Sequence, residues 1–392
     1  MSQTETMILN MGPQHPSTHG VLRLILELDG ERVVDARPDI GFLHSGIEKT
    51  GENRTYRQVL PYTDRMDYVS AMTHNLGYVL AVEKLLGLEV PPRTQYIRVI
   101  MAELSRLASH LIWWGTSVMD LSGVSGVVLM YCFHEREKVL NLFEAVSGQR
   151  LTPSYFRLGG LAADLPEGWV TQARAFIDQL PAQINEMERI VNHNPIFLDR
   201  TVGVGVLSAV DAVAYGITGP ALRAAGIPYD VRKAMPYSGY ERFEFEVPVG
   251  QHGDVYDRYL VRLAEMRQSL RIIEQALNGL PDGPINADDG KVVLPPRAEL
   301  DKSMEALIHH FKLVTEGFHP PAGQVFMSVE ASKGELGYYL VSDGGPRPYR
   351  FRVRTPSFAA VQVLPLLIRG RLIADVVATI GSMDLVMGEV DR

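Results

Sequence analysis

The sequence predicts an α+β protein, in which a small N-terminal antiparallel sheet precedes a central helix bundle and a mixed C-terminal part. Three observations predict this order. Apolar and polar residues alternate in short runs near the N-terminus, apolar residues recur at helical spacing through the middle, and strand-like runs return near the end. No repeat or long linker interrupts the 392 residues, so we expect one unit with a β-rich part (1–60), a helical core (61–280) and a mixed part (281–392).

The N-terminal sheet is predicted from the runs TMILNM, VLRLILEL and ERVVDA, which are separated by turn residues. Asp29-Gly30, between the second and third runs, is a strong signal for a two-residue hairpin. The loop GPQHPSTHG, which precedes the second run, carries His15 and His19. We therefore expect these histidines to lie in a loop that extends from a rigid sheet.

His15 and His19 have the four-residue spacing of zinc ligands on a helix, but Pro16 and the surrounding glycines argue against a helix here. No glutamate follows the first histidine, so the metalloprotease pattern is missing and zinc binding is a minor alternative. A single loop histidine is best explained by hydrogen bonds within the loop. Two histidines in one rigid loop instead favour a functional role.

The helix bundle is predicted most clearly at residues 97–112, where apolar residues form one helical face. Gly87 and Gly148 are expected to end two further helices. Residues 111–133 are long enough to span a bilayer as one helix, but Asp120 and the serines and glycines after it predict two buried helices joined by a loop. We expect no transmembrane segment. Other helices are predicted at about 65–86, 126–147, 167–190, 257–278 and 301–315.

The C-terminal part is predicted to be mixed α and β. The strand-like runs QVFMSVEA, GYYLVSDG and YRFRVRT are followed there by the apolar run FAAVQVLPLLI. Earlier in the chain, GVGVLS at 203–208 half-matches the dinucleotide fingerprint GxGxxG, but Ser208 replaces the third glycine. We interpret it as a strand and a helix cap. Because no GxxxxGK[ST] is present either, the chain is expected to bind neither NAD nor ATP.

The composition excludes several classes of function. The formal net charge is −8, so no global positive field exists to attract nucleic acid or anionic lipid. Cys132 is the only cysteine, so the chain cannot form an internal disulfide or supply the four thiolates of an iron–sulfur cluster. Any cluster must belong to a partner. The start MSQTETMILNMG lacks the features of a signal peptide, which predicts a cytoplasmic protein.

The segment GPQHPSTHGVLRL closely resembles the N-terminal signature of the 49 kDa (D-type) subunit family of respiratory complex I. Further segments resemble the same family in the same order, and together they cover nearly the whole chain: GFLHSGIEKT, YRQVLPYTDRMDYVSAM, ELSRLASHL, VEASKGELGYYLVSDG and MDLVMGEVDR. The resemblance implies a fold like that of the nickel–iron hydrogenase large subunit. Those hydrogenases hold nickel with paired CxxC motifs, which this sequence lacks, so nickel is excluded.

The resemblance also implies a function. The chain would form the quinone-reducing pocket of a proton-translocating NADH:quinone oxidoreductase, together with a partner that carries the iron–sulfur cluster. NADH would be oxidised on another subunit, and this chain would bind no NAD, FMN or metal. The implied partners are the cluster-bearing B-type subunit, the C-type and I-type subunits, and the H-type subunit of the membrane arm. The implied location is the cytoplasmic side of the inner membrane, and the quinone is ubiquinone or menaquinone.

The family's site residues fall on His19 and Tyr68, which would hold the two carbonyl ends of the quinone, and on Asp120, which would pair with the histidine. Histidine and phenol can donate the two protons that quinol formation consumes. His15 is grouped with the quinone-binding residues. Without the resemblance, Tyr68 would be interpreted as a core tyrosine and Asp120 as a helix cap or loop carboxylate.

Arg65, three residues before Tyr68, resembles an arginine that the family places near the partner's cluster, and His44 is a second candidate there. Two positions depart from the pattern of many members. Ser45 stands where they carry arginine, and Thr152 stands in the region of a histidine linked to cluster protonation. Proton coupling at the cluster is therefore expected to differ in this chain.

Two further interpretations concern structure. Glu103, Arg106 and His110 share one polar stripe of a predicted helix, where pairing within the helix and packing explain them. The alternative to a quinone-site role is a non-catalytic scaffold that only docks the cluster-bearing partner and the membrane arm. The presence of both His19 and Tyr68 argues against that scaffold.

Overall fold

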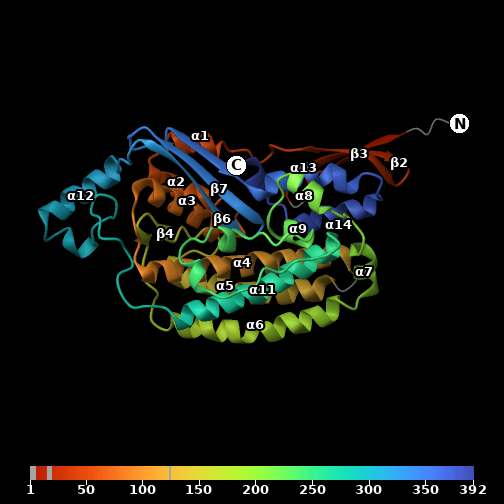
Figure 1. Cartoon of the computed structure of the whole chain (residues 1–392), viewed down its shortest axis with the longest axis horizontal. Coiled ribbons are helices and arrows are strands. Elements are labelled where there is room, and N and C mark those ends of the chain that lie inside the picture. Colours follow the sequence, from red (N-terminus) through yellow and green to blue (C-terminus); the bar gives the residue numbers. More distant parts are fainter. Residues whose placement is uncertain (1–5, 16–19, 123–124) are drawn as a thin grey trace.

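The computed structural model describes residues 6–15, 20–122 and 125–392. It confirms the predicted α+β class. In Figure 1 a C-terminal sheet lies above the long helices of the bundle, and an N-terminal sheet lies at the opposite end of the molecule from α12.

The N-terminal sheet is antiparallel, in the order β1-β2-β3, and confirms the prediction. Its strands are β1 (Met7–Met11), β2 (Arg23–Asp29) and β3 (Arg32–Asp39). The leucines on one face of β2, Leu24 and Leu26, are fully buried, as the alternating pattern requires. Gly30 has φ 60, which the predicted Asp29-Gly30 hairpin needs.

Two short helices follow this sheet within the part predicted to be β-rich. They are α1 (Ile47–Glu52) and α2 (Tyr56–Thr63). Thr55 and Gln58 form a capping box at the start of α2, in which the Thr55 backbone N–H donates to Gln58 Oε1 at 3.1 Å. The β-rich part therefore ends at β3, well before residue 60.

The helix bundle confirms the central prediction. Its long helices are α3 (Ala71–Leu86), α4 (Pro92–Leu121), α5 (Ser125–Ser147), α6 (Trp169–Val191) and α11 (Val255–Asn278). Helices α5 and α11 both pack on α4, and α6 covers α5 and α11 from outside (Figure 1). Gly87 and Gly148 end α3 and α5 with φ 66 and 73, as predicted.

Residues 111–121 form the end of α4 and residues 125–133 the start of α5, so the two predicted helices are confirmed. The predicted burial of the second helix is wrong, because Val127 and Met130 at the start of α5 are 52% and 71% exposed. Within the described residues, no helix combines the length and the apolar character needed to cross a membrane.

Short elements connect the bundle helices. They are β4 (Phe156–Arg157), β5 (Gly160–Leu161), α7 (Pro195–Thr201), α8 (Ala209–Ala214), α9 (Gly219–Ala224), α10 (Val231–Ala234) and the 3-10 helix η2 (Tyr240–Arg242). Gly203 and Gly205 adopt left-handed φ values of 72 and 55, so GVGVLS is a loop and the predicted strand is wrong. The predicted cap is confirmed, because Ser208 Oγ accepts from the Asp211 backbone N–H at 3.1 Å.

The C-terminal part is mixed, as predicted. Its elements are η3 (Arg297–Glu299), α12 (Met304–Thr315), β6 (Gly323–Ala331), β7 (Gly334–Ser342), β8 (Arg350–Arg354), α13 (Pro356–Ile368), α14 (Ile373–Met383) and α15 (Met387–Asp391). The sheet is antiparallel, in the order β6-β7-β8, and α3 packs against it. Gly77 permits this approach, since a Cβ there would lie 2.9 Å from the Tyr338 ring.

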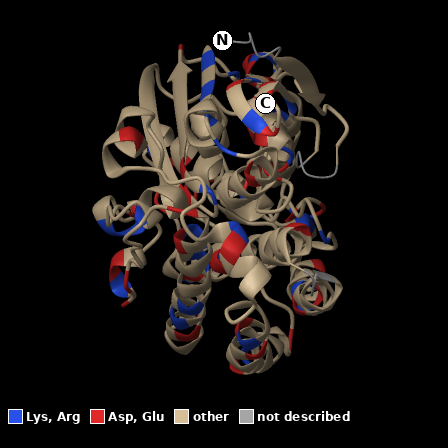
Figure 2. Cartoon of the chain, turned by 90° about the vertical axis from the view of Figure 1, so that its right-hand side faces the viewer, with Lys and Arg blue, Asp and Glu red and all other residues tan. Residues whose placement is uncertain are grey.

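The buried hydrophobic residues form two clusters. One joins the bundle to the C-terminal sheet, and the other lies between the N-terminal sheet and α13, α14 and α15. Figure 2 shows acidic and basic residues intermixed along the ribbon, at the edges of the view and also in its middle. The organisation as one unit remains a prediction.

Candidate functional site

Tyr68 lies in a turn between α2 and α3, not in the helix predicted to begin near residue 65. The reason is local: the Asp67 carboxylate Oδ1 accepts from the backbone N–H groups of Val69 and Ser70, at 3.1 and 3.2 Å, and so closes a turn of its own. The Tyr68 side chain is 40% exposed, so part of the ring remains open to a ligand. Burial of the rest, together with the Asp67 carboxylate, raises the pKa of Tyr68 and keeps the phenol protonated.

The turn that carries Tyr68 packs against α15. A Cβ at Gly388 would lie 3.5 Å from Cε1 of Tyr68 and 2.8 Å from the Met66 carbonyl oxygen. Only a glycine allows the two segments to approach this closely. The hollow that Tyr68 lines with Ala108 and Leu140 has a volume of about 10 Å³, room for no more than a water molecule.

The histidine loop is described only at its ends, since His19 lies outside the described residues. His15 is exposed and forms an isolated bridge with Gly20. A Cβ at Gly20 would lie 3.8 Å from Cγ of Met387, the first residue of α15. Gly20, at the end of the histidine loop, therefore lies against α15, the helix that Tyr68 also contacts.

Asp120 is half-buried in the last turn of α4. Ser105, in the same helix, has its hydroxyl 3.4 Å from that of Ser70. At 1.5 Å per residue, about 22 Å of helix axis separates Ser105 from Asp120. Because Ser70 is two residues from Tyr68, Asp120 lies far along the helix from the turn that carries Tyr68. The resemblance pairs Asp120 with His19, not with Tyr68, and that pairing stays a prediction.

The two residues expected near a partner's cluster line different hollows. Arg65 is exposed, donates to the Pro61 carbonyl oxygen and lines an open hollow of about 570 Å³ with Tyr62. His44 Nδ1 lies 2.7 Å from the Asp391 carbonyl oxygen. The Asp391 carboxylate in turn accepts from the backbone N–H groups of Gly41 and Leu43, at 2.8 and 2.7 Å, and fixes the His44 loop to the C-terminal residues.

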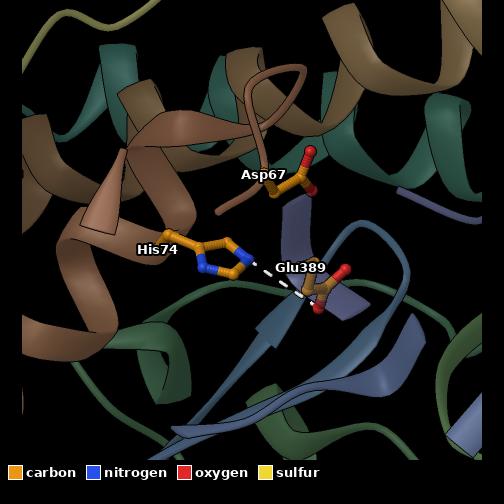
Figure 3. Close-up of side chains that lie close together, drawn as sticks. All are labelled: Asp67, His74 and Glu389. Carbon is orange, nitrogen blue, oxygen red and sulfur yellow. Dashed lines mark ion pairs between the residues drawn. The ribbon is translucent and has the colours of Figure 1, made fainter. Parts of the chain in front are cut away.

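A buried polar cluster lies beside Tyr68, and none of the motifs read from the sequence predicts it. A ring nitrogen of His74 and one carboxylate oxygen each of Asp67 and Glu389 lie within 4.8 Å of one another (Figure 3). Lys333 Nζ lies 3.4 Å from Asp67 Oδ2 and 3.5 Å from Asp384 Oδ2. Three distant stretches of the chain, 67–74, 333 and 384–389, supply these residues, so no single spacing in the sequence indicates the cluster. The available signal is that Asp67, Lys333, Asp384 and Glu389 lie within segments that resemble the family.

Burial sets the charges in this cluster. It raises the pKa of Glu389 to about 8, with help from the Asp67 and Asp384 carboxylates, and it lowers the pKa of His74 to about 4. Burial alone would lower the pKa of Lys333, but the carboxylates of Asp384 and Asp67 raise it. At neutral pH the cluster therefore holds a charged lysine, a neutral histidine and a protonated Glu389.

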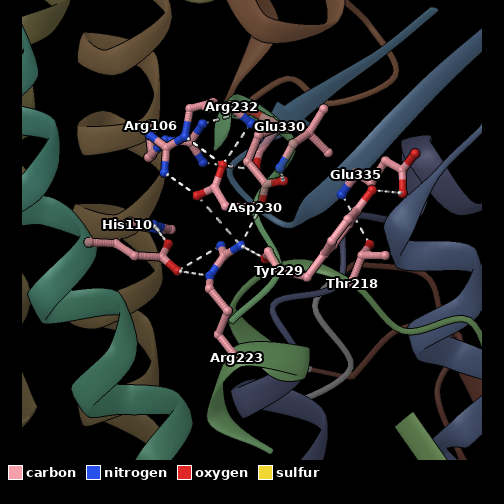
Figure 4. A network of polar contacts seen from close by, with 12 residues as sticks. Arg106, His110, Thr218, Arg223, Tyr229, Asp230, Arg232, Glu330 and Glu335 are labelled. Carbon is pink, nitrogen blue, oxygen red and sulfur yellow. Dashed lines mark hydrogen bonds and ion pairs between the residues drawn. The ribbon is translucent and has the colours of Figure 1, made fainter. Parts of the chain in front are cut away.

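A second buried network explains the polar residues of α4. Arg106 pairs with Glu103 at 3.2 Å, as expected, and also donates to the Glu330 and Ala331 carbonyl oxygens. Glu103 accepts from Arg232 at 2.9 Å, and the two arginines lower its pKa to about 2 although burial alone would raise it. Figure 4 shows how this network joins α4, α9, α10 and β6. Its members pair with one another, which supports the structural role predicted for them.

The free energy of unfolding should depend on pH through Asp64. This residue is fully buried, accepts from the Ser154 hydroxyl, and has its pKa raised to about 6, chiefly by burial. Since the unfolded chain releases this proton near pH 3.8, Asp64 costs stability as the pH rises from about 4 to 6. We expect Asp64→Asn to raise the free energy of unfolding by roughly 1–3 kcal/mol at pH 7.5 and by little at pH 4. Urea unfolding of the full chain at both pH values measures this, and a pH-independent difference would contradict it.

Comparison with known proteins identifies the family. The family model described as respiratory-chain NADH dehydrogenase, 49 Kd subunit, matches residues 123–392. The chain is 56% identical over 390 residues to a D-type subunit of NADH-quinone oxidoreductase from Koribacter versatilis, which covers all of this chain and 97% of that protein. The D-type subunits from Geotalea uraniireducens and Geobacter sulfurreducens are 55% and 54% identical over 392 residues, with both chains fully covered. The chain therefore belongs to the 49 kDa subunit family of respiratory-chain NADH dehydrogenase.

Proposed function

We propose that this chain, with a partner that carries an iron–sulfur cluster, builds the pocket in which an NADH:quinone oxidoreductase reduces its quinone. The observation that carries the proposal is the position of Tyr68. Its phenol is protonated and partly exposed, and it lies against α15, which Gly20 at the end of the histidine loop also contacts. A donor that is open to a ligand on one side and backed by buried charges on the other suits the reduction of a carbonyl compound.

A partner is needed to complete the pocket. The hollow at Tyr68 within the described residues, about 10 Å³, is far smaller than a quinone ring. Electrons must also come from outside, because Cys132 is the only cysteine and burial raises the pKa of its thiol to about 12, which makes it a poor metal ligand. The cluster-bearing B-type subunit is the proposed partner at this face.

The chemistry assigns a donor to each end of the quinone. Two electrons and two protons convert a quinone to a quinol. Tyr68 would donate to one carbonyl oxygen and His19 to the other, with Asp120 holding the imidazole charged. His15 would border the head group, and Arg65 would favour the reduced state of the partner's cluster.

The assembled complex supplies the rest of the reaction. We assign no NAD, FMN or metal to this chain, and place NADH oxidation on another subunit. The C-type and I-type subunits and the H-type subunit of the membrane arm are the other proposed neighbours, on the cytoplasmic side of the inner membrane. Either ubiquinone or menaquinone suits two donors at opposite carbonyls.

A photoreactive quinone tests the proposal. With the reactive group on the quinone ring, irradiation of the assembled complex should label this chain within residues 65–70 or 384–392, and excess unlabelled quinone should abolish the label. A probe with the same reactive group on a hydrocarbon without carbonyls serves as the control and should label elsewhere. Label found only on partner chains, by mass spectrometry of the peptides, would instead support the scaffold role.

A further inference from the structure

The buried cluster beside Tyr68 contains two groups suited to exchange a proton. Glu389 Oε1 lies 3.8 Å from His74 Nε2, and both side chains are fully buried. Within the described part of the chain, neither ring nitrogen of His74 has a hydrogen-bond partner, and Oε1 of Glu389 has none either. Buried polar atoms left in this state are costly, so their retention calls for an explanation. The other oxygen of Glu389 is held by Ser357, whose hydroxyl donates to Oε2 at 2.6 Å.

The charges around Glu389 favour its protonated form. Asp67 in the turn before α3 and Asp384 after α14 both pair with Lys333 of the β6–β7 turn, and the buried Arg262 of α11 also acts on Asp384. Burial and these two carboxylates raise the pKa of Glu389, whereas Lys333 and the Ser357 hydroxyl lower it. His74 of α3 is neutral, and the fully buried Tyr338 of β7 stays protonated and adds no charge. A third carboxylic acid in this position therefore keeps its proton.

This cluster is coupled to Tyr68 in two ways. Asp67 is its neighbour in the chain, and Gly388, which precedes Glu389, contacts the Tyr68 ring. The charges of Asp67, Lys333 and Asp384 also act on the phenol, since each of them shifts the pKa of Tyr68. A proton that leaves or enters the cluster therefore changes the ease with which Tyr68 gives up its own.

We propose that Glu389 and His74 hold a reserve proton that restores Tyr68 after its phenol has protonated the reduced quinone. This inference rests on the proposed function. Tyr68 gives its proton to the quinol oxygen and becomes a tyrosinate. The Glu389 proton passes to His74 Nε2 and from that nitrogen to the Asp67 carboxylate, and Asp67 then gives a proton to the tyrosinate. Glu389 remains as a carboxylate and recovers a proton from solvent, so charge and protons balance.

The first two transfers bridge short gaps. The 3.8 Å between Glu389 and His74, and the separation of at most 4.8 Å between a ring nitrogen of His74 and Asp67, exceed a hydrogen bond. A small side-chain movement or one bridging water closes such a gap. Glu389 does not touch the quinone and acts only through Tyr68.

The first test is Glu389→Gln in the assembled complex. Glutamine keeps the shape and still accepts from Ser357, but it has no acidic proton to give. We expect quinone-dependent NADH oxidation to fall roughly tenfold or more, with oxidation by an artificial acceptor unchanged. The alkaline limb of the parental pH profile, expected near the pKa of about 8 of Glu389, should disappear.

Two further variants shift the same limb in opposite directions. Ser357→Ala removes a hydrogen bond that lowers the pKa of Glu389, so the limb should move to higher pH. Asp384→Asn removes a negative charge that raises it, so the limb should move to lower pH. Asparagine suits this position, because Asp384 has φ 55. A merely structural role would change the amount of assembled complex without moving the limb.

The outcomes separate this inference from the proposed function. If Glu389→Gln keeps the parental rate and pH profile while a change at Tyr68 slows turnover, the proton reserve is wrong and the quinone site stands. If changes at Tyr68 have no effect, the proposed function fails first. If the Glu389→Gln complex does not assemble, the Ser357 and Asp384 variants decide. Alkaline limbs of their pH profiles that do not shift from the parental position would overturn the inference.

Discussion

Replacement of Tyr68 with phenylalanine is expected to slow quinone reduction by roughly one to three orders of magnitude, as for other donors to a developing oxyanion. The change removes one hydroxyl and leaves the ring, so the contact of the ring with Gly388 survives. Assembly should therefore be normal. Quinone-dependent NADH oxidation by the assembled complex measures the effect.

The control is NADH oxidation by an artificial acceptor, which bypasses the pocket. The two activities must separate in this variant. If the assembled Tyr68→Phe complex reduced quinone at the parental rate, Tyr68 would be a packing residue. A parallel loss of both activities would show that the tyrosine is needed for assembly, and the scaffold role would gain support.

Replacement of Arg223 with methionine is expected to lower the free energy of unfolding by roughly 3–5 kcal/mol, the usual effect of breaking a buried ion pair. Arg223 is fully buried, with Nη2 2.7 Å from Glu265 and Nη1 2.8 Å from Glu330. Together with Asp230 these carboxylates raise the pKa of Arg223, although burial alone would lower it. Methionine fills part of the volume but leaves the two glutamates without this cation.

Urea unfolding of the full chain measures this loss. Arg369→Ala is the matched control, because its ion pair with Asp35 lies at the surface and should matter little. The pH dependence should change as well, since Glu265, whose pKa is held at about 2, would take up a proton more readily without Arg223. Equal stability of the Arg223 and Arg369 variants would show that the remaining arginines neutralise the network unaided.

Elements governed by local chemistry could be predicted from the sequence. Gly87 and Gly148 end their helices because a left-handed cap suits glycine, and Asp29-Gly30 forms its hairpin for a related reason. The strand predicted at GVGVLS is wrong because two glycines at positive φ cannot be told from strand glycines by pattern alone. The predicted start of α3 is too early, since the side-chain bonds of Asp67 that close the preceding turn leave no periodic signal.

The candidate site was only partly predictable. Tyr68 was found through family resemblance, and its place on the open side of a turn gives that prediction a physical setting. The roles of His19 and Asp120 stay predictions. His74, Lys333 and Glu389 were out of reach of sequence reasoning, because their significance depends on burial and on contacts between distant segments.

The contact between Asp391 and the His44 loop also determines when, during synthesis, this loop can be anchored to the C-terminal residues. Asp391 is 350 positions from Gly41 and 347 from His44. At about 5–20 residues per second, on the order of 20–70 s passes between the appearance of the loop at the ribosome and that of its anchor. Contacts of such long range are made late in folding. The His44 loop can therefore take up this anchored position only after residue 391 has been synthesised.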